Sequence, residues 1–134
     1  MSVKYILSER GNSLKPDEKK KWYAVAKSEG DITLKALGKE ITQRSTVNHA
    51  DTLAVLESLT QLLTERLAEG RIVRFGDFGS FQITLGSKGA EKEELFNTSL
   101  IKSKKVTFRP GADLKEMLNN LKFEKTQRTL PKKN

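Results

Sequence analysis

The sequence predicts an α+β fold, and three observations along the chain support that prediction. Residues 3–27 hold two short β-prone runs joined by a loop rich in turn formers and charges. Two stretches of helical periodicity follow between residues 33 and 69, and from residue 71 β-branched and aromatic residues return. The 134 residues suffice for one hydrophobic core.

The first 30 residues predict a β-hairpin that precedes the main domain. Val3, Tyr5 and Leu7 occupy alternate positions, as in a half-buried strand, and the run WYAVAK at 22–27 is also β-prone. Gly, Asn, Pro and several charges lie between these runs, which is typical of a solvated loop. We therefore treat residues 1–30 as an N-terminal hairpin extension.

Two helices are expected over residues 33–44 and 48–69. The first repeats apolar residues at helical spacing after turn and capping residues at 28–31. The second begins with Asn48 as its N-cap and stops at Gly70, a residue type that commonly ends helices. The short connection between them predicts a helical hairpin.

The second helix carries a wider apolar face than one neighbouring helix would cover. Its leucines form a single stripe, which Val55 and Leu62 widen. Such a face indicates burial on two sides and predicts a homodimer, with a core helix of a monomer as the alternative. The residues expected in the dimer core are Leu53, Leu56, Leu59, Leu63, Phe78 and Phe81.

Residues 71–85 predict strands that meet in a tight turn near Gly76 to Gly79, because glycines within a strand pattern mark bends or close backbone approaches. Residues 86–105 are polar and weakly patterned. A loop of that length within a compact domain is unusual, so we expect it to protrude as an arm.

A strand that ends at the turn 109–111 and a short helix over 113–121 complete the pattern. We place the main domain at residues 31–123. The basic residues 124–134 predict a flexible tail.

Charge points to an anionic partner. The chain carries 25 Lys and Arg against 17 Asp and Glu, a net charge of +8. This excess favours nucleic acid or an anionic membrane surface, with solubility alone as the alternative. No leader peptide and no run of 18 apolar residues is visible, and Cys is absent, so we expect a cytoplasmic chain without a membrane segment.

The residues offer no constellation for catalysis, for a cofactor or for a metal. His49 is the only histidine and is expected to lie solvated at a helix start. No glycine-rich phosphate loop occurs, and the glutamates at 91, 93 and 94 do not match a calcium-binding loop. We therefore expect no enzymatic activity, no cofactor, no metal site and no small-molecule substrate.

Two motifs behind the helical hairpin resemble the HU and integration host factor family of bacterial histone-like proteins. Phe78, Gly79, Ser80 and Phe81 match the family's Phe-Gly-Ser/Thr-Phe core. Its Phe-Lys/Arg-Pro/Ala-Gly-x-x-Leu-Lys element is matched by Phe108, Arg109, Pro110, Gly111, Leu114 and Lys115. The resemblance covers residues 31–121, and the extension before it is similar to that of the longer HU-related proteins of Bacteroides-type bacteria.

This resemblance implies an architectural, nucleoid-associated protein that binds double-stranded DNA with little sequence preference. It implies an HU-like fold, an intertwined homodimer with a helical base, a sheet saddle, and two β-arms that reach into the minor groove. Basic and hydroxyl side chains on the sheet, arm and last helix are the phosphate contacts we expect. These are Arg74, Ser80, Lys88, Lys102, Lys104, Lys105, Arg109 and Lys115.

The arm departs from the family pattern. It has no proline to wedge between base steps, and Glu91, Glu93 and Glu94 near its midpoint would repel phosphates. Leu95 or Phe96 is a candidate substitute wedge, with burial of both against the arm as the alternative. The acidic arm keeps two other hypotheses open: a dimeric interaction or assembly protein with weak DNA binding, and an RNA-binding variant.

Overall fold

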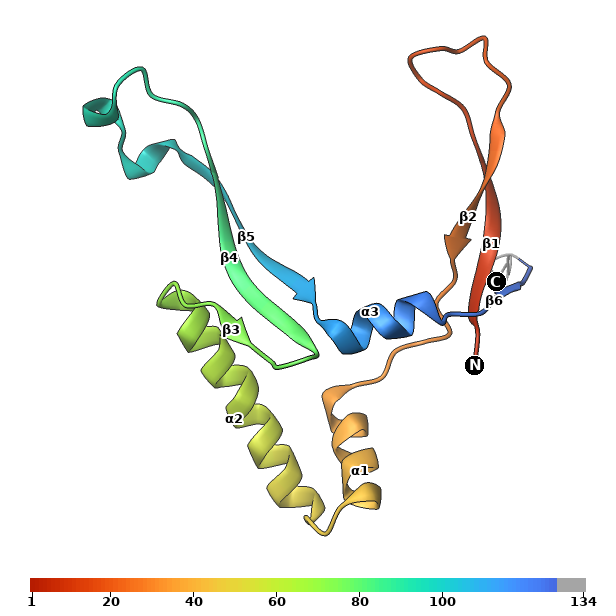
Figure 1. Cartoon of the computed structure of the whole chain (residues 1–134), viewed down its shortest axis with the longest axis vertical. Helices are drawn as coiled ribbons and strands as arrows, with labels where there is room; N and C mark the ends of the chain where they lie inside the picture. The colour runs from red at the N-terminus through yellow and green to blue at the C-terminus, as the bar shows by residue number, and fades with distance from the viewer. Residues whose placement is uncertain (128–134) are drawn as a thin grey trace, which may run out of the picture. The chain divides into compact units, whose positions relative to one another are not determined.

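The computed structural model describes residues 1–127, which form two compact units (Figure 1). Unit 1 combines residues 1–32 with the chain from residue 119 onward, and unit 2 is residues 33–118. Helices and two small sheets occur together in the described chain, so the predicted α+β class is confirmed.

Unit 1 is a three-stranded sheet. Its strands are β1 (Val3–Arg10), β2 (Lys21–Ala26) and β6 (Phe123–Lys125), in the order β2-β1-β6. β1 and β2 pair antiparallel from Tyr5 opposite Ala26 to Arg10 opposite Lys21. β6 lies parallel to β1 on its other edge.

β6 differs from the loose tail expected over residues 124–134. Residues 124 and 125 are part of the strand, and the ladder continues where the Thr126 amide donates to the Tyr5 carbonyl oxygen at 2.9 Å. β1 is the central strand: β2 pairs with one of its edges, and β6 forms hydrogen bonds with the backbone N–H and C=O groups of the other edge. Residues 128–134 of the expected tail lie outside the described residues.

Unit 2 begins with two helices, α1 (Leu34–Arg44) and α2 (His49–Ala68). The Asn48 side chain accepts from the Asp51 amide at 2.8 Å, as its expected capping role requires. The cap of α1 is Thr33, which accepts from the Ala36 amide, and so lies just after the segment 28–31 where we expected it.

The second sheet contains β3 (Val73–Arg74), β4 (Gly79–Ser87) and β5 (Ile101–Pro110), paired antiparallel in chain order. Two single-turn 3-10 helices, η1 (Glu93–Leu95) and η2 (Thr98–Leu100), lie between β4 and β5, and α3 (Ala112–Asn119) follows. We call residues 82–107 the arm, the long ribbon of β4 and β5 with its tip in Figure 1. Residues 101–105, expected within a weakly patterned segment, form strand.

Four phenylalanine rings gather at the base of the arm. Phe81 lies 4.8 Å from Phe108 and 6.2 Å from Phe75 between ring centroids, and Phe78 lies 5.7 Å from Phe108. These separations are typical of stabilising aromatic pairs. The cluster is the apolar centre of the sheet in unit 2.

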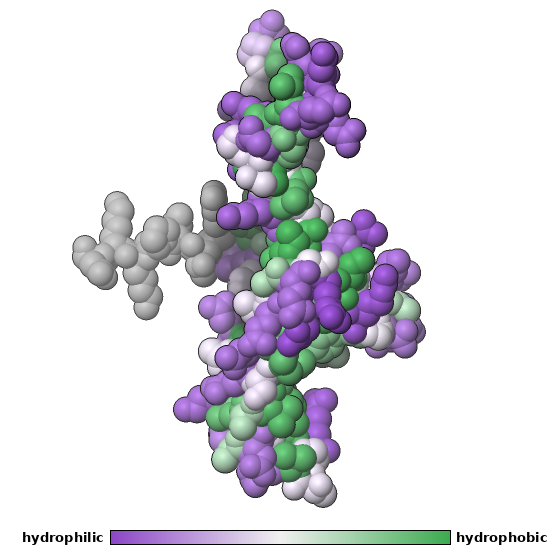
Figure 2. Space-filling model, turned by 90° about the vertical axis from the view of Figure 1, so that its left-hand side faces the viewer, coloured by the Kyte–Doolittle hydropathy of each residue, from purple (hydrophilic) through white to green (hydrophobic). Residues whose placement is uncertain are grey.

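Even so, no hydrophobic side chain among the described residues is fully buried. Leucines and phenylalanines that would form a core are half-buried or exposed, and Figure 2 shows hydrophobic surface (green) interleaved with hydrophilic surface. A single copy of the chain therefore leaves an unusual amount of apolar surface in water.

Candidate nucleic-acid interface

Three of the expected phosphate contacts lie in one row across the sheet of unit 2. Arg74 of β3 pairs with Ser80 of β4, which pairs in turn with Arg109 of β5. Directly paired residues project from the same face of a sheet, so one hydroxyl is flanked by two guanidinium groups.

The row continues into a polar face along the arm. Because alternate residues share a face, the members of this polar face are Arg74, Ser80, Gln82, Thr84, Lys105, Thr107 and Arg109. Thr84 and Thr107 join across the strands through their hydroxyl oxygens, 3.0 Å apart. No described carboxylate forms an ion pair with any of the three cations. Their charge is free to meet an anion.

The opposite face of the same sheet is apolar. It is formed by Val73, Phe81, Ile83, Leu85, Val106 and Phe108. Lys104 pairs with Leu85 and so projects from this face, whereas Lys105 pairs with Thr84. Both lysines border a hollow of about 380 Å³ that Leu67, Ile83 and Val106 also line. The register therefore separates Lys104 from Lys105, although the two are adjacent in sequence.

The remaining expected contacts lie apart from the row. Lys102 has no partner across the strands, because the register shifts at Gly86 and Ser87. The Lys88 amide donates to the Leu100 carbonyl oxygen at 2.8 Å, which places Lys88 where the arm opens into its tip. Lys115 is exposed in α3.

Two motif glycines hold β5 against the turn before β4. A Cβ at Gly79 would lie 2.5 Å from the Arg109 carbonyl oxygen and 2.6 Å from the Phe108 ring, and its φ of +153° also disfavours other residues. A Cβ at Gly111 would overlap the Asp77 backbone. The Gly111 amide donates to the Phe78 carbonyl oxygen at 2.8 Å, so the two motifs bind each other directly.

The arm tip is acidic and also exposes apolar side chains. Glu91, Glu93 and Glu94 are all exposed, as expected for a solvated charge run. Leu95 and Phe96 are 61% and 42% exposed, so they are not buried against the arm. A role of either side chain as a wedge between base steps stays a prediction.

The residues expected in a dimer core occupy two environments in unit 2. Leu53 and Leu56 are half-buried over Gly38 of α1, within one chain. Leu59 and Leu63 line an open hollow of about 490 Å³ between α2 and β3, which Phe75 also lines. Phe81 packs in the aromatic cluster, whereas Phe78 is 47% exposed.

Phe75 is a member of the cluster that the sequence motifs did not single out. It precedes the turn at Gly76, and its amide donates to the Gly79 carbonyl oxygen at 2.8 Å. Its signal in the sequence was its place in the aromatic run RFGDFGSF, where three phenylalanines recur around two glycines.

The family described as an HU domain fused to wHTH, Ig, or glycine-rich motif, HU-HIG, matches residues 1–125. The chain belongs to the HU-HIG family. The match includes the whole of unit 2 and, in unit 1, the β1–β2 hairpin and β6. The resemblance to HU-like proteins, which the two sequence motifs indicated, is thereby confirmed.

Individual relatives agree with this HU-HIG membership. The DNA-binding protein HU of Thermotoga maritima is 28% identical over 87 residues, which are 63% of this chain and 97% of that protein. A solved structure of a candidate bacterial DNA-binding protein from Bacteroides vulgatus has a TM-score of 0.64 at 13% identity. That comparison covers 96% of this chain but spans only half of the Bacteroides chain, and it shows a shared fold.

Two other kinds of site do not occur among the described residues. No helix there has the length and apolar character needed to cross a membrane. Likewise, residues 1–127 bring no three His, Cys, Asp or Glu side chains together in a way that would hold a metal ion.

Proposed function

We propose that this HU-HIG protein is an architectural, nucleoid-associated protein that binds double-stranded DNA with little regard to base sequence. The observation that carries the proposal is the polar face, where Arg74, Ser80 and Arg109 align and Lys105 follows along β5. Arginines, a lysine and hydroxyls of this kind bind phosphate oxygens. The groups read the DNA backbone rather than base edges, and the protein bends or condenses DNA through minor-groove arms.

The functional unit in this proposal is a homodimer. Leu59, Leu62 and Leu63, which line a hollow together with Arg66 and Arg74, and the exposed Phe78 supply apolar surface that a second copy would cover. A two-fold axis would also pair two polar faces, doubling the number of phosphate contacts.

A duplex titration at several salt concentrations tests the proposal. Three cations on each polar face give about six phosphate contacts per dimer, so the logarithm of affinity should fall with the logarithm of salt at a slope of roughly 5. Duplexes of equal length and unrelated sequence should bind alike. A slope near zero, or no duplex binding at low salt, would reject DNA binding by this face.

The acidic arm tip favours a second candidate function. Glu91, Glu93 and Glu94 are placed where the family implies contact with DNA, and three carboxylates would oppose phosphate there. In this second hypothesis the protein is a dimeric interaction or assembly protein on an HU scaffold. This second hypothesis is preferred if the duplex titration shows no binding and light scattering still shows a dimer.

A further inference from the structure

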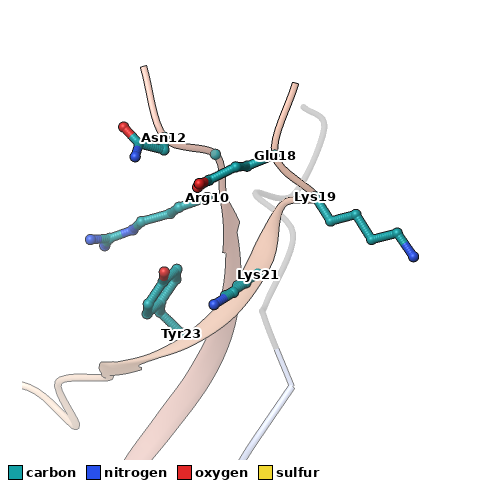
Figure 3. Close-up of a pocket in the computed structure, with 7 residues that line it drawn as sticks. Arg10, Asn12, Glu18, Lys19, Lys21 and Tyr23 are labelled. Atoms are coloured by element: carbon teal, nitrogen blue, oxygen red, sulfur yellow. The ribbon is translucent and has the colours of Figure 1, made fainter. Parts of the chain in front are cut away.

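The tip of the N-terminal hairpin carries basic residues that the polar face does not use. Arg10 and Lys21 form the last pair of the β1–β2 ladder, and a hollow of about 360 Å³ opens beside them. Asn12, Glu18 and Tyr23 also line it (Figure 3). A hollow of this volume is large enough for a small organic ligand.

The pairing of Arg10 with Lys21 is unfavourable in the protein alone. Like charges directly opposite each other on one face of an antiparallel pair repel. No described carboxylate forms an ion pair with either side chain. Elsewhere in unit 1, Lys4 has an acidic partner: its Nζ lies 2.5 Å from Oε1 of Glu29. The hydrogen bond to this carboxylate raises the pKa of the Lys4 ammonium. An anion between Arg10 and Lys21 would relieve their repulsion.

An aromatic ring stands next to this charged pair. Tyr23 lies two residues from Lys21 on β2 and so projects from the same face, and it is 47% exposed. In Figure 3 the side chains of Arg10, Asn12, Glu18, Lys21 and Tyr23 are directed to one side of the hairpin, whereas Lys19 is directed away. Cations that hold phosphate beside an aromatic ring that stacks on a base are the means by which proteins bind single-stranded nucleic acid.

We propose that the hairpin tip binds a nucleotide of a single-stranded nucleic acid, with its phosphate between Arg10 and Lys21 and its base on Tyr23. An unpaired base is required, because the faces of bases within a duplex are covered by their neighbours in the stack. This site is distinct from the polar face of unit 2 and its preference is for single strands rather than duplexes.

Glu18 is the one acidic group that lines the hollow, and its ion-pair partner is Lys15, 3.6 Å away. Against Arg10 and Lys21 it leaves this side of the hairpin net positive. Removing its charge should therefore strengthen binding of a phosphate. Glu18→Gln is a variant in which affinity should rise rather than fall.

The test is a titration of the full chain with a fluorescein-labelled hexathymidine strand, followed by anisotropy. Arg10→Ala with Lys21→Ala should weaken binding about tenfold, whereas Lys35→Ala with Lys39→Ala, which removes the same charge from exposed positions of α1 outside the hollow, should change it less than about twofold. Tyr23→Ala should weaken binding at least about fivefold, and Tyr23→Phe should restore it because the ring makes the contact.

Nuclear magnetic resonance of the unmodified protein provides a measurement that needs no variant. Stacking of a base should shift the Tyr23 ring protons upfield. Tyr5 is the other of the two tyrosines and projects from the opposite face of the sheet, so its ring signals should stay in place.

Three results would overturn the proposal: equal loss in the two double variants, full binding by Tyr23→Ala, or equally tight binding of a hexaglutamate peptide. The first and third would mean that only net charge matters. A blunt duplex titrated in parallel separates this site from the proposed function. If the unmodified protein binds the duplex but not hexathymidine, the hairpin site is rejected. If it binds hexathymidine but not the duplex, DNA binding by the polar face is rejected.

Discussion

Lys104 and Lys105 provide a matched pair at the scale of single residues. They are adjacent and carry the same charge, yet Lys105 belongs to the polar face and Lys104 pairs with Leu85 on the apolar face. Lys105→Ala should lower the salt slope of duplex binding by about two per dimer, because one phosphate contact is lost from each protomer. Lys104→Ala should leave the slope unchanged. Equal effects in salt-dependent titrations would contradict the assignment of DNA to the polar face.

Gly79→Ala should destabilise the protein by at least about 2 kcal/mol. The added methyl group would collide with the Arg109 carbonyl oxygen and the Phe108 ring, and the backbone conformation there is itself unfavourable for alanine. Gly89→Ala is the control, since a methyl group added there would meet no atom within 4 Å and the φ of Gly89 is not positive. Thermal unfolding should show a lower Tm for the first variant alone.

The sequence allowed some residues to be placed and not others. Gly79 and Phe81 were identified because their motif has few alternatives at those positions. Lys104 was grouped with Lys105 because a run of lysines has no visible alternation, and only the pairing of β4 with β5 fixes which lysine faces which way. Phe75 was missed because a ring that completes a cluster is recognised only once its partners are placed.

At the scale of elements, local chemistry predicted well and non-local pairing did not. The Asn48 cap and the end of α2 before Gly70 follow from side chains that act within one turn of the chain. β6 was unpredictable because three residues near one end of the chain become a strand only by pairing with β1 near the other. Short edge strands of this kind carry little signal of their own.

The arm is the element whose charge can be tested directly. Changing Glu91, Glu93 and Glu94 together to Gln should tighten duplex binding, because three carboxylates near phosphates are removed without loss of side-chain size. The gain should shrink as salt rises, since screening weakens the repulsion. Unchanged affinity at low salt, measured by the same titration, would show that the arm tip does not approach DNA.

At the scale of the whole molecule, the sequence predicted that the apolar face of α2 needs more cover than α1 supplies. In the structure Leu53 and Leu56 are half-buried over Gly38, while Leu59 and Leu62 remain exposed. The width of the face was therefore readable from the leucine pattern. The leucine pattern does not identify the partner that covers this face, because an apolar stripe fits any complementary surface.

Leu62 provides the test of a homodimer. It is 49% exposed in one chain and lines the hollow with Leu59 and Leu63, so a second copy seated there would bury it. Leu62→Glu would then place a carboxylate in a mostly apolar interface, which is unfavourable. Light scattering of the unmodified protein should give twice the 15.1 kDa of one chain, and Leu62→Glu should lower that mass towards one chain.

Gln61→Glu is the control for this substitution, because it adds the same charge one residue away at an exposed position outside the hollow. It should keep the mass of the dimer. A dimer also leaves a thermodynamic signature, since apparent Tm rises with protein concentration when folding and association are linked. A monomer mass for the unmodified protein, with a Tm independent of concentration, would reject the dimer and leave the apolar face of α2 to a different partner.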